Sequence, residues 1–557
     1  MDKEQLFAKT RDLNLLGQAR WPIQKTLLTF LGLSLVMFLV CAAETVYNEI
    51  LGTVMSELGS TLFAQWIAAA FLLTCVMVQP VWVKLAEKFG RLWPLLASVA
   101  IFMVFSVMVG AAQSMVALCV GRALQGVGGA GMMPLSLVVL TDILSPGERG
   151  VYIGFLGAVI VLGKWTGPAI GAALHESSTW RWAGYYNLPV GAVALAILFL
   201  TLRDLPTPPG AVKRKIREFD YLGTILWMGG STMILLGLSL GGNEHAWRSV
   251  IVVCLFVFGF IVILLFGVFE GKWAKWPIIP LRMLARPRVL LPMISSFLIG
   301  FCLYGMIMFV PIYYSTVLDQ SALQSVRHLL WCALGGCVGA VVAGSLVQVR
   351  RRWYYREWAV LGTAMMTVGF GLMYVWPLDG EAKAKHAGYQ VLIGLGLGFS
   401  MQQVLLSAQA GLPANEISTA TTLIDYARTL GGMVGLVIGE VILKEKVFQA
   451  VNEMGFGSFV GTATGGTDFV QLESMLPLLR MLPSSISLPI YKGIVNAIHY
   501  VYVTDVPFAG TACILCMLVS NVPLHHILPA TNSEELLETQ RNLHSSSDDG
   551  KEQLLSQ

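Results

Sequence analysis

The sequence has little charge for its length. Of its 557 residues only 13% are Asp, Glu, Lys or Arg, about half the share found in soluble globular domains. Hydrophobic residues make up 55% of the chain, and the mean hydropathy is +0.69. This balance excludes a cytosolic enzyme, a disordered scaffold and a nucleic-acid-binding protein. It predicts a polytopic membrane protein whose partners include the lipid bilayer and no nucleic acid.

Other missing features exclude further classes. All nine cysteines lie inside apolar runs, so we expect no disulfide framework. The chain lacks a phosphate-cradling GxxxxGK[ST] string, a metal-ligand cluster and a catalytic nucleophile constellation. No cleavable signal peptide is evident, because the first 26 residues are polar and mixed in charge. We therefore expect no enzyme activity, no cofactor, no metal and no use of ATP.

What the chain has instead is a series of apolar stretches of about 20 residues, long enough to span a bilayer as helices. They lack the alternating pattern of barrel strands, so helices are the expected spanning elements. The prediction is an all-α membrane protein with fourteen transmembrane helices. The stretches lie at about 27–46, 62–82, 94–113, 115–141, 151–174, 184–202, 219–240, 249–268, 289–316, 325–348, 357–377, 388–411, 418–442 and 501–526.

The stretches group as six, two and six. Lysine and arginine gather in the segments that are cytoplasmic if the N-terminus lies inside, so both termini are expected to be cytoplasmic. Within the long loop expected at residues 443–498, Met475 to Leu482 is expected to form an amphipathic surface helix. The expected divisions are an N-terminal segment (1–26), an N-terminal six-helix bundle (27–203), a linker with two helices (204–287), a C-terminal six-helix bundle (288–526) with a long outer loop (443–498), and a disordered cytoplasmic tail (527–557).

Charged residues inside the apolar stretches are functional candidates by default. An arginine at the middle of a spanning helix costs about 2.5–3.5 kcal/mol, so Arg122 requires a carboxylate partner or a polar cavity. Lys164 lies deep in its stretch, where it either binds an anionic substrate or pairs with Glu44. Gln402 and Gln403 are further polar residues within the membrane and are candidates for substrate contacts.

Several strings resemble the motifs of one transporter family, the major facilitator superfamily. The loop from Val83 to Arg91 resembles the family's loop between spans 2 and 3, although Val83 replaces its usual glycine and Glu87 its usual aspartate. Gly121 to Gly131 is similar to its span-4 arginine motif. The residues that resemble the antiporter signature of its drug exporters are Gly163, Gly167, Pro168 and Gly171, and the strings 180–191, 277–281 and 425–432 also resemble fourteen-span exporters.

The resemblance implies the major facilitator fold, a central cavity and alternating access. It identifies the chain as similar to fungal toxin and multidrug exporters, which exchange amphipathic organic compounds (a toxin, secondary metabolite or drug) for protons. The expected proton-coupling residues are Glu44, Arg122, Asp425 and Arg428. Substrate contacts are expected from Lys164, Gln402 and Gln403, and the cytoplasmic gate from Glu87, Gly90, Arg91, Asp142, Glu148 and Arg149.

Two other functions remain as alternatives. One is an importer on the same fold, which would carry a siderophore or a basic amino acid. The other is a non-transporting membrane receptor. As an exporter, the protein is expected to be a monomer in the plasma membrane, with the vacuolar membrane as the alternative, and to have a small-molecule substrate and protons as partners.

Overall fold

The computed structural model describes residues 22–521 except for short gaps and two longer ones. The residues left out of this range are 48–49, 60–65, 145–147, 178, 204–218, 242–244, 275–276, 280, 317, 319, 350–354, 376–382, 413 and 454–483. Almost all of the N-terminal segment, the expected surface helix at 475–482 and the expected tail therefore lie outside the described residues. Within the described part, helices make up the fold and no strand forms beyond one isolated bridge between Gly241 and His245.

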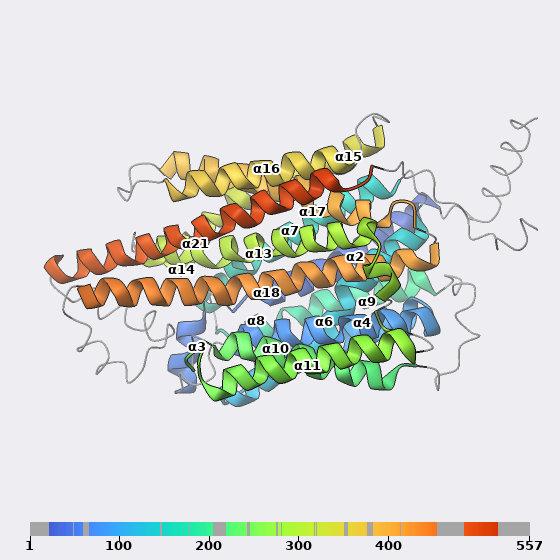
Figure 1. The fold of residues 1–557 in the computed structure, drawn as a ribbon, viewed down its shortest axis with the longest axis horizontal. Coiled ribbons are helices and arrows are strands. Elements are labelled where there is room, and N and C mark those ends of the chain that lie inside the picture. The colour runs from blue at the N-terminus through green and yellow to red at the C-terminus, as the bar shows by residue number, and fades with distance from the viewer. Residues whose placement is uncertain are drawn as a thin grey trace, which may run out of the picture.

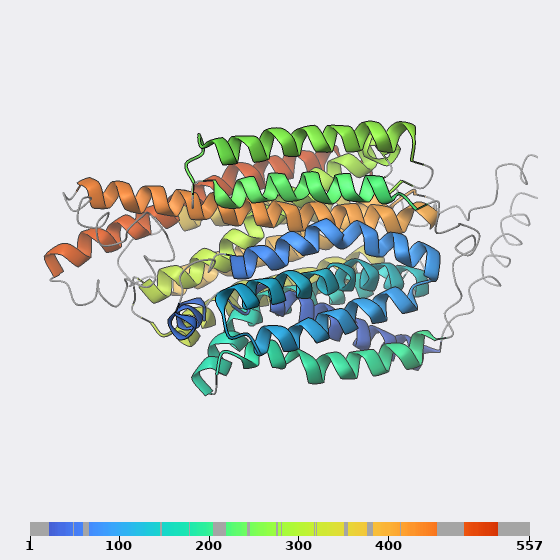
Figure 2. The same cartoon turned by 90° about the horizontal axis from the view of Figure 1, so that it is seen from below.

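The N-terminal bundle contains six long helices, which lie roughly side by side in Figures 1 and 2. Two short helices join them, α3 (Leu51–Leu58) and α8 (Trp182–Tyr185). The six are α2 (Ile23–Thr45), α4 (Trp66–Phe89), α5 (Leu92–Gly110), α6 (Met115–Ile143), α7 (Arg149–Ser177) and α9 (Asn187–Leu202).

Two linker helices follow, α10 (Tyr221–Leu240) and α11 (Val250–Lys272), and they pack against each other. Asp220 caps α10 by accepting the Gly223 N–H at 2.7 Å, and Ser249 caps α11. Large apolar side chains such as Phe258, Phe260 and Leu264 are exposed along α11. Such a surface is stable in lipid and costly in water.

The C-terminal bundle begins after the short helix α12 (Leu281–Leu284), and α14 (Ala322–Arg327) leads into its second long helix. In Figure 1 the ribbons of α18 and α21 extend beyond the other helices on the left. The six long helices are α13 (Pro287–Thr316), α15 (Leu329–Val349), α16 (Tyr355–Tyr374), α17 (Lys383–Gln409), α18 (Ala414–Glu453) and α21 (Ser484–Leu518).

Among the described residues, thirteen helices are long and apolar enough to cross a membrane. The remaining expected span corresponds to α16, which has 20 residues and packs against α17 and α21. Its first turn carries Arg356 and Glu357, and these charges lower the apolar character of a helix that is otherwise long enough. The arrangement is two six-helix bundles with a two-helix linker.

The ends of the last two long helices differ from the prediction. The expected loop at 443–498 is too long, because α18 continues to Glu453 and α21 begins at Ser484. The last helix also ends at Leu518, earlier than expected. The apolar run of α18 ends before Lys444, Glu445 and Lys446. The helix nevertheless continues, because helical hydrogen bonds join backbone groups and do not depend on apolar side chains. The extension is supported by apolar side chains of the two helices that share one buried cluster, Leu443, Val447, Ile494, Val495 and Ile498.

We name the two ends of the bundle by their residues. The Gly90 end contains the turn between α4 and α5, where Gly90 has a φ of 82°. A positive φ is readily adopted by glycine and seldom by residues with a side chain, so Gly90 permits this tight turn. The opposite end, named the α3 end, contains α3 and the turn from Ala111 to Ser114.

Candidate functional site

An ion-paired triad lies where the two bundles meet. Lys164 of α7 pairs with Glu44 of α2, and its ammonium donates to the Tyr304 hydroxyl of α13 at 2.7 Å. The Tyr304 hydroxyl in turn donates to Glu44 Oε2 at 2.8 Å. Glu44, Lys164 and Tyr304 are all at least 95% buried. Of the two roles considered for Lys164, the structure shows the pair with Glu44, and it adds a tyrosine from the other bundle.

The glycines of α7 bring the triad together. A Cβ at Gly163 would lie 2.7 Å from Cys41 Cβ, and one at Gly167 or Gly171 would overlap the carbonyl oxygen of Ala42 in α2 or of Val46 directly after it. Pro168 lies inside the same helix. Because these positions carry no side chain, α7 packs backbone to backbone on α2. Thr45 of α2 uses this closeness to donate a hydrogen bond to the Lys164 carbonyl at 3.0 Å.

A pocket that opens to solvent borders the triad on the side of the α3 end, and its empty space, with open solvent included, is about 610 Å³. Glu44 and Tyr304 contribute to its wall, and Lys164 does not. Apart from a second carboxylate, Glu440, and the hydroxyl-bearing Thr45, the rest of the wall is apolar or aromatic, and both bundles contribute to it. Its other lining residues are Thr45, Tyr47, Leu51, Ile67, Ala68, Leu72, Ile307, Met308 and Leu436.

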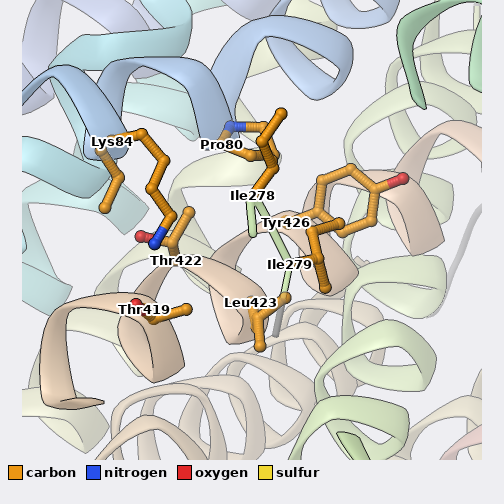
Figure 3. A pocket seen from close by; sticks show the side chains of 9 residues that line it. Pro80, Lys84, Ile278, Ile279, Thr419, Thr422, Leu423 and Tyr426 are labelled. Carbon is orange, nitrogen blue, oxygen red and sulfur yellow. The ribbon is translucent and has the colours of Figure 1, made fainter. Parts of the chain in front are cut away.

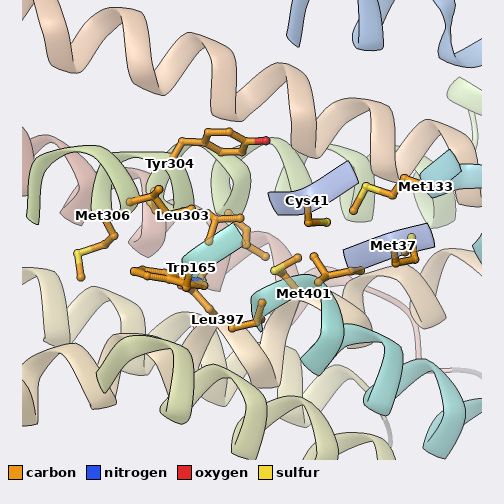
Figure 4. Close-up of a cluster of buried hydrophobic side chains, with 14 of the residues drawn as sticks. Met37, Cys41, Met133, Trp165, Leu303, Tyr304, Met306, Leu397 and Met401 are labelled. Atoms are coloured by element: carbon orange, nitrogen blue, oxygen red, sulfur yellow. The ribbon is translucent and has the colours of Figure 1, made fainter. Parts of the chain in front are cut away.

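Next to the triad, the two bundles are in close contact through apolar side chains. Figure 4 shows Trp165 and Met37 of the N-terminal bundle beside Leu397 and Met401 of α17, with Tyr304 above them. These side chains belong to one buried cluster that continues through both bundles. Met133, Tyr304 and Met401 are all buried, and of these only Tyr304 lines the cavity.

A second buried ion pair joins the bundles nearer the Gly90 end. Asp425 and Arg428 of α18 pair with each other one turn apart, and Gln79 of α4 donates to Asp425 Oδ2 at 2.6 Å. Asp425 and Arg428 are 1% and 3% exposed. The sequence suggested both charged residues but did not indicate Gln79, since a glutamine in an apolar run carries no distinct pattern.

Arg122 is compensated without a carboxylate. Its Nε donates to the Ile67 carbonyl at 3.0 Å and its Nη1 to Gln125 Oε1 at 2.8 Å. The guanidinium also lies over the rings of Tyr47 and Phe71, 5.0 and 4.3 Å from their centroids. Of the two ways considered for offsetting the charge of Arg122, a carboxylate or polar surroundings, the described residues show polar acceptors together with cation–π contacts.

We predict that Arg122→Lys destabilises the protein although the charge is kept. A lysine cannot both stack between two rings and donate in two directions, because its ammonium is compact and not planar. Lost cation–π and hydrogen-bond contacts of this kind are worth about 2–4 kcal/mol together. The thermal melting temperature of the purified protein should fall well below that of a control variant, Arg181→Lys, whose side chain is partly exposed. An unchanged melting temperature would contradict this account of Arg122.

The residues expected to form a gate make several separate contacts at the Gly90 end. Arg91 Nε donates to Asp142 Oδ2 at 2.7 Å, so α5 is tied to the end of α6. Glu87 pairs with Lys84 at 3.1 Å and accepts a hydrogen bond from Thr419 of α18 at 3.3 Å, which links the two bundles.

Asp142 and Arg149, both expected at the gate, bind different partners at the end of α6. Arg149 Nη2 donates to the Thr141 carbonyl at 2.8 Å, and Asp142 is paired with Arg91 instead. Arg149 therefore holds the end of α6 through its backbone. The charged residues of the sequence indicated the segment between α6 and α7. The partner of Arg149 could not be predicted, because a backbone carbonyl has no signal in the sequence.

Gln402 and Gln403 of α17 are fully buried at the interface between the bundles. Their side-chain nitrogen and oxygen atoms find no hydrogen-bond partner among the described residues. Gln402 packs on α7, where a Cβ at Gly157 would lie 2.6 Å from its Cγ. Neither side chain lines the pocket beside the triad.

Sequence reasoning missed three buried acids, Asp220, Glu270 and Asp505, and the most deeply buried of them is Asp505 of α21. It is 1% exposed, lies beside Gly305 of α13, and its Oδ2 has no hydrogen-bond donor in the described part of the chain. An acid inside the apolar stretch expected at 501–526 was the available signal.

Comparison with known proteins places this geometry in a family. The sequence profile of the Major Facilitator Superfamily matches residues 33–436. The chain belongs to the Major Facilitator Superfamily. This membership confirms the predicted fold class, an integral membrane protein with the major facilitator fold, and shows a transporter of small molecules rather than an enzyme.

Among similar proteins, the MFS-type efflux pump MMF1 of Pseudozyma antarctica is 30% identical over 499 residues, which cover 89% of this chain and 90% of that protein. The efflux pump dotC of Dothistroma septosporum is 29% identical, with 89% and 84% covered. Of solved structures, the proton:xylose symporter XylE is similar in fold, with a TM-score of 0.56, 12% identity and coverage of 90% of this chain and all of that one. The predicted resemblance to fungal efflux pumps is thereby confirmed.

Proposed function

We propose that this transporter exports an amphipathic organic compound, such as a toxin, a secondary metabolite or a drug, in exchange for protons. The observation that carries the proposal is the Glu44–Lys164–Tyr304 triad, which joins the two bundles beside a pocket lined by both of them. The names of the similar fungal proteins, which are efflux pumps, support the direction of transport. The glycines and proline of α7 are the residues that resemble an antiporter signature.

Proton coupling is assigned to Glu44. Burial favours the protonated form of a carboxyl group, whereas a neighbouring ammonium favours the carboxylate. Because the Lys164 pair also includes Tyr304 from the other bundle, separation of the bundles would change the surroundings of Glu44. Glu44 would therefore bind a proton in one state of the cycle and release it in the other. Arg122 and the Asp425–Arg428 pair would stabilise the closed state rather than carry the proton.

The orientation follows from charge. Lys84, Lys88 and Arg91 lie at the Gly90 end, which we assign to the cytoplasm together with both termini. Contacts between the bundles, such as Thr419 to Glu87 and Gln79 to Asp425, close that end. The cavity lies toward the α3 end, so the conformation corresponds to the stage at which substrate leaves. Plasma-membrane location and a monomeric state belong to the same proposal, with the vacuolar membrane as the alternative.

The cavity favours neutral or cationic amphipathic substrates. Its wall contains two carboxylates, two tyrosines and many aliphatic side chains, and no basic residue. Lys164 is committed to Glu44 and Tyr304 in this conformation. Gln402 and Gln403, whose amides are buried without hydrogen-bond partners in the described residues, would offer polar contacts once the bundles separate.

The test is accumulation of fluorescent and radiolabelled compounds in cells that express the chain, with and without a protonophore. Lower accumulation than in control cells, abolished by the protonophore, is the expected result. Higher accumulation would replace the proposal with the importer of a siderophore or basic amino acid. Ligand-dependent signalling without any flux would replace it with the receptor.

A further inference from the structure

Asp505 places a carboxyl group at the centre of a membrane-spanning helix. It lies midway along the spanning part of α21, Lys492–Leu518, and is 1% exposed. Among the described residues, its Oδ2 receives no N–H or O–H donor, and no lysine, arginine or histidine forms an ion pair with it. A carboxylate without a positive partner is unfavourable at this depth, so the group requires a bound cation.

The charged groups of the neighbouring helices are held by other partners or lie at the surface. α21 packs against α13, α16 and α18. On α18, Asp425 and Arg428 pair with each other, and on α16, Arg356 pairs with Glu357 at 3.4 Å. Arg288, at the start of α13, is exposed. None of these three arginines neutralises the buried carboxyl group of α21.

The ionisable side chains next to Asp505, in the described part of the chain, are a thiol and a phenol. Cys302 Sγ of α13 donates to the Asp505 backbone carbonyl at 3.6 Å, and Tyr502 lies one turn earlier on α21. Neither group carries a positive charge. Farther toward the α3 end lie Tyr374 of α16, Glu440 of α18 and His499 of α21. A proton, which converts the carboxylate into a neutral acid, is therefore the cation that suits this apolar position.

Asp505 lies against the middle of α13, the helix that carries Tyr304 of the triad. A Cβ at Gly305 would lie 3.2 Å from Asp505 Oδ2 and 3.7 Å from Oδ1. The preceding residue, Tyr304, donates to Glu44 at 2.8 Å, and Met308, one turn beyond, lines the pocket beside the triad. α13 thus contacts the buried acid through one side and the triad through another. A change in charge at Asp505 acts on the helix that positions Tyr304.

Both helices at this contact contain proline. Pro292 and Pro311 lie inside α13, and Pro507 lies inside α21, two residues beyond the buried acid. Each proline removes a helical hydrogen bond and allows the helix to bend. Beside the acid, the rings of Phe301 and Phe508 stack with their centroids 4.0 Å apart and hold the two helices together. A charged carboxylate would draw water between the helices, so the proton favours the packed arrangement.

This packed arrangement occurs in the conformation that is closed at the Gly90 end. Figure 3 shows part of that closure, with Ile278 and Ile279 of the segment after α11 between Pro80 of α4 and Leu423 of α18. In the proposed cycle this is the stage at which substrate leaves and a proton enters. The environment of the acid therefore favours a bound proton at the stage when a proton exchanger takes one up.

We propose that Asp505 is a second proton-binding residue of the transport cycle, which adds to Glu44 and does not replace it. Its carboxylate takes up one proton when the Gly90 end closes, and the neutral acid releases that proton when α13 and α21 move apart. Because the closed conformation binds the proton more tightly, closure is favoured at low pH and weakened as the pH rises. The inference rests on the proposed exchange of substrate for protons and assigns it a further proton.

Infrared difference spectroscopy detects the bound proton without any substrate, because a carboxylic acid and a carboxylate absorb at different frequencies. The full chain and Asp505→Asn are compared in lipid nanodiscs at pH 7. We expect the parent to show a carboxylic acid band that shifts in D2O and that the variant lacks. The matched control is Glu176→Gln, because Glu176 is exposed at the α3 end and ionised at pH 7, so its removal should leave the band unchanged.

A labelling experiment tests whether this proton acts on the Gly90 end. The nine native cysteines are replaced, with serine at position 302 to keep a donor, and Thr422→Cys is introduced into the wall of the pocket of Figure 3. Its rate of reaction with a maleimide is divided by that of Gln113→Cys, which is exposed at the α3 end, to correct for thiol ionisation. The corrected rate should be higher at pH 8 than at pH 6.

Asparagine at position 505 has the shape of the protonated acid and cannot release a proton. In Asp505→Asn, the ratio of the corrected rates at pH 8 and pH 6 should therefore be about tenfold smaller than in the parent, as for a one-unit linkage effect. The melting temperature should stay close to that of the parent, and Glu176→Gln should keep the parent's ratio. If Asp505→Asn does not fold, Asp505→Leu, which is also neutral, should give the same reduced ratio.

Three outcomes would overturn the assignment. The first is the absence of a carboxylic acid band that depends on Asp505. The second is a band that sodium ions remove, which would show a sodium site instead. The third is an unchanged ratio of labelling rates in a folded neutral variant, which would show that the acid is structural. Failure of every export assay with the band and the labelling pattern intact would contradict the proposed function alone.

Discussion

Glu44→Gln is expected to abolish proton-dependent export and to destabilise the protein. Glutamine has nearly the same shape, but it cannot bind and release a proton and it leaves the Lys164 ammonium without a counter-charge. Removal of one partner from a buried ion pair costs about 3–5 kcal/mol. With Glu44 and Lys164 both at least 95% buried, the full effect should apply. Export driven by an imposed pH gradient in proteoliposomes is the measurement for coupling, and thermal melting is the measurement for stability.

A double variant separates the two consequences. In Glu44→Gln with Lys164→Met neither charge remains, so the desolvation penalty disappears, and replacement of a whole buried pair by uncharged groups is often neutral or stabilising. The melting temperature should return toward that of the parent, whereas proton-dependent export should stay absent. Recovery of export together with stability would show that the pair is structural and that the proton is carried elsewhere.

A suitable control for Glu44 is Glu57→Gln. Glu57 pairs with Arg181 at 3.1 Å and accepts from Trp180 Nε1 at 2.7 Å, but it is partly exposed at the α3 end. Pairs of exposed residues contribute only about 0–1 kcal/mol. Glu57→Gln should therefore keep proton-dependent export. Full proton dependence in Glu44→Gln would contradict the assignment of the proton to Glu44.

Gly171→Ala is expected to disrupt the packing of α7 on α2. A Cβ at Gly171 would overlap the Val46 carbonyl oxygen, which is backbone and cannot rotate away. Overpacking of a tight contact typically costs about 1–3 kcal/mol. The helices must separate, and this movement also displaces Lys164 from Glu44. Loss of export and a lower melting temperature should occur together.

The matched control is Gly371→Ala on α16, where a Cβ would meet no atom within 4 Å. Alanine is the better helix former by about 1 kcal/mol, so this variant should be as stable as the parent or more stable. Equal melting temperatures for the two variants would show that the close approach at Gly171 has no energetic role. The comparison isolates packing because both changes are glycine to alanine within a long helix.

Much of the fold was predictable because a bilayer imposes simple rules. A spanning segment must satisfy its own backbone hydrogen bonds, so each long apolar run predicts one helix. This reasoning places the long helices correctly from α2 to α17. It fails at α18 and α21, where helices extend beyond the apolar run, because charged residues such as Lys444 and Glu445 can continue a helix that leaves the membrane.

The candidate site was predictable in its residues more than in its partners. Charged residues in apolar runs are rare, so Glu44, Arg122, Lys164 and Asp425 were evident from the sequence. Their partners were less evident, since Arg122 uses a backbone carbonyl, an amide and two aromatic rings. Such acceptors occur throughout any membrane helix and carry no distinct pattern.

By itself, the sequence determined the membrane class, the six-two-six grouping and the resemblance to drug exporters, because hydropathy and local motifs depend on residues close together in the chain. Only the tertiary structure decided that Tyr304 completes the Glu44–Lys164 pair and that Asp142 pairs with Arg91. These contacts join helices far apart in the chain. Their geometry depends on how whole helices pack, and glycine contacts such as Gly171 on Val46 set that packing.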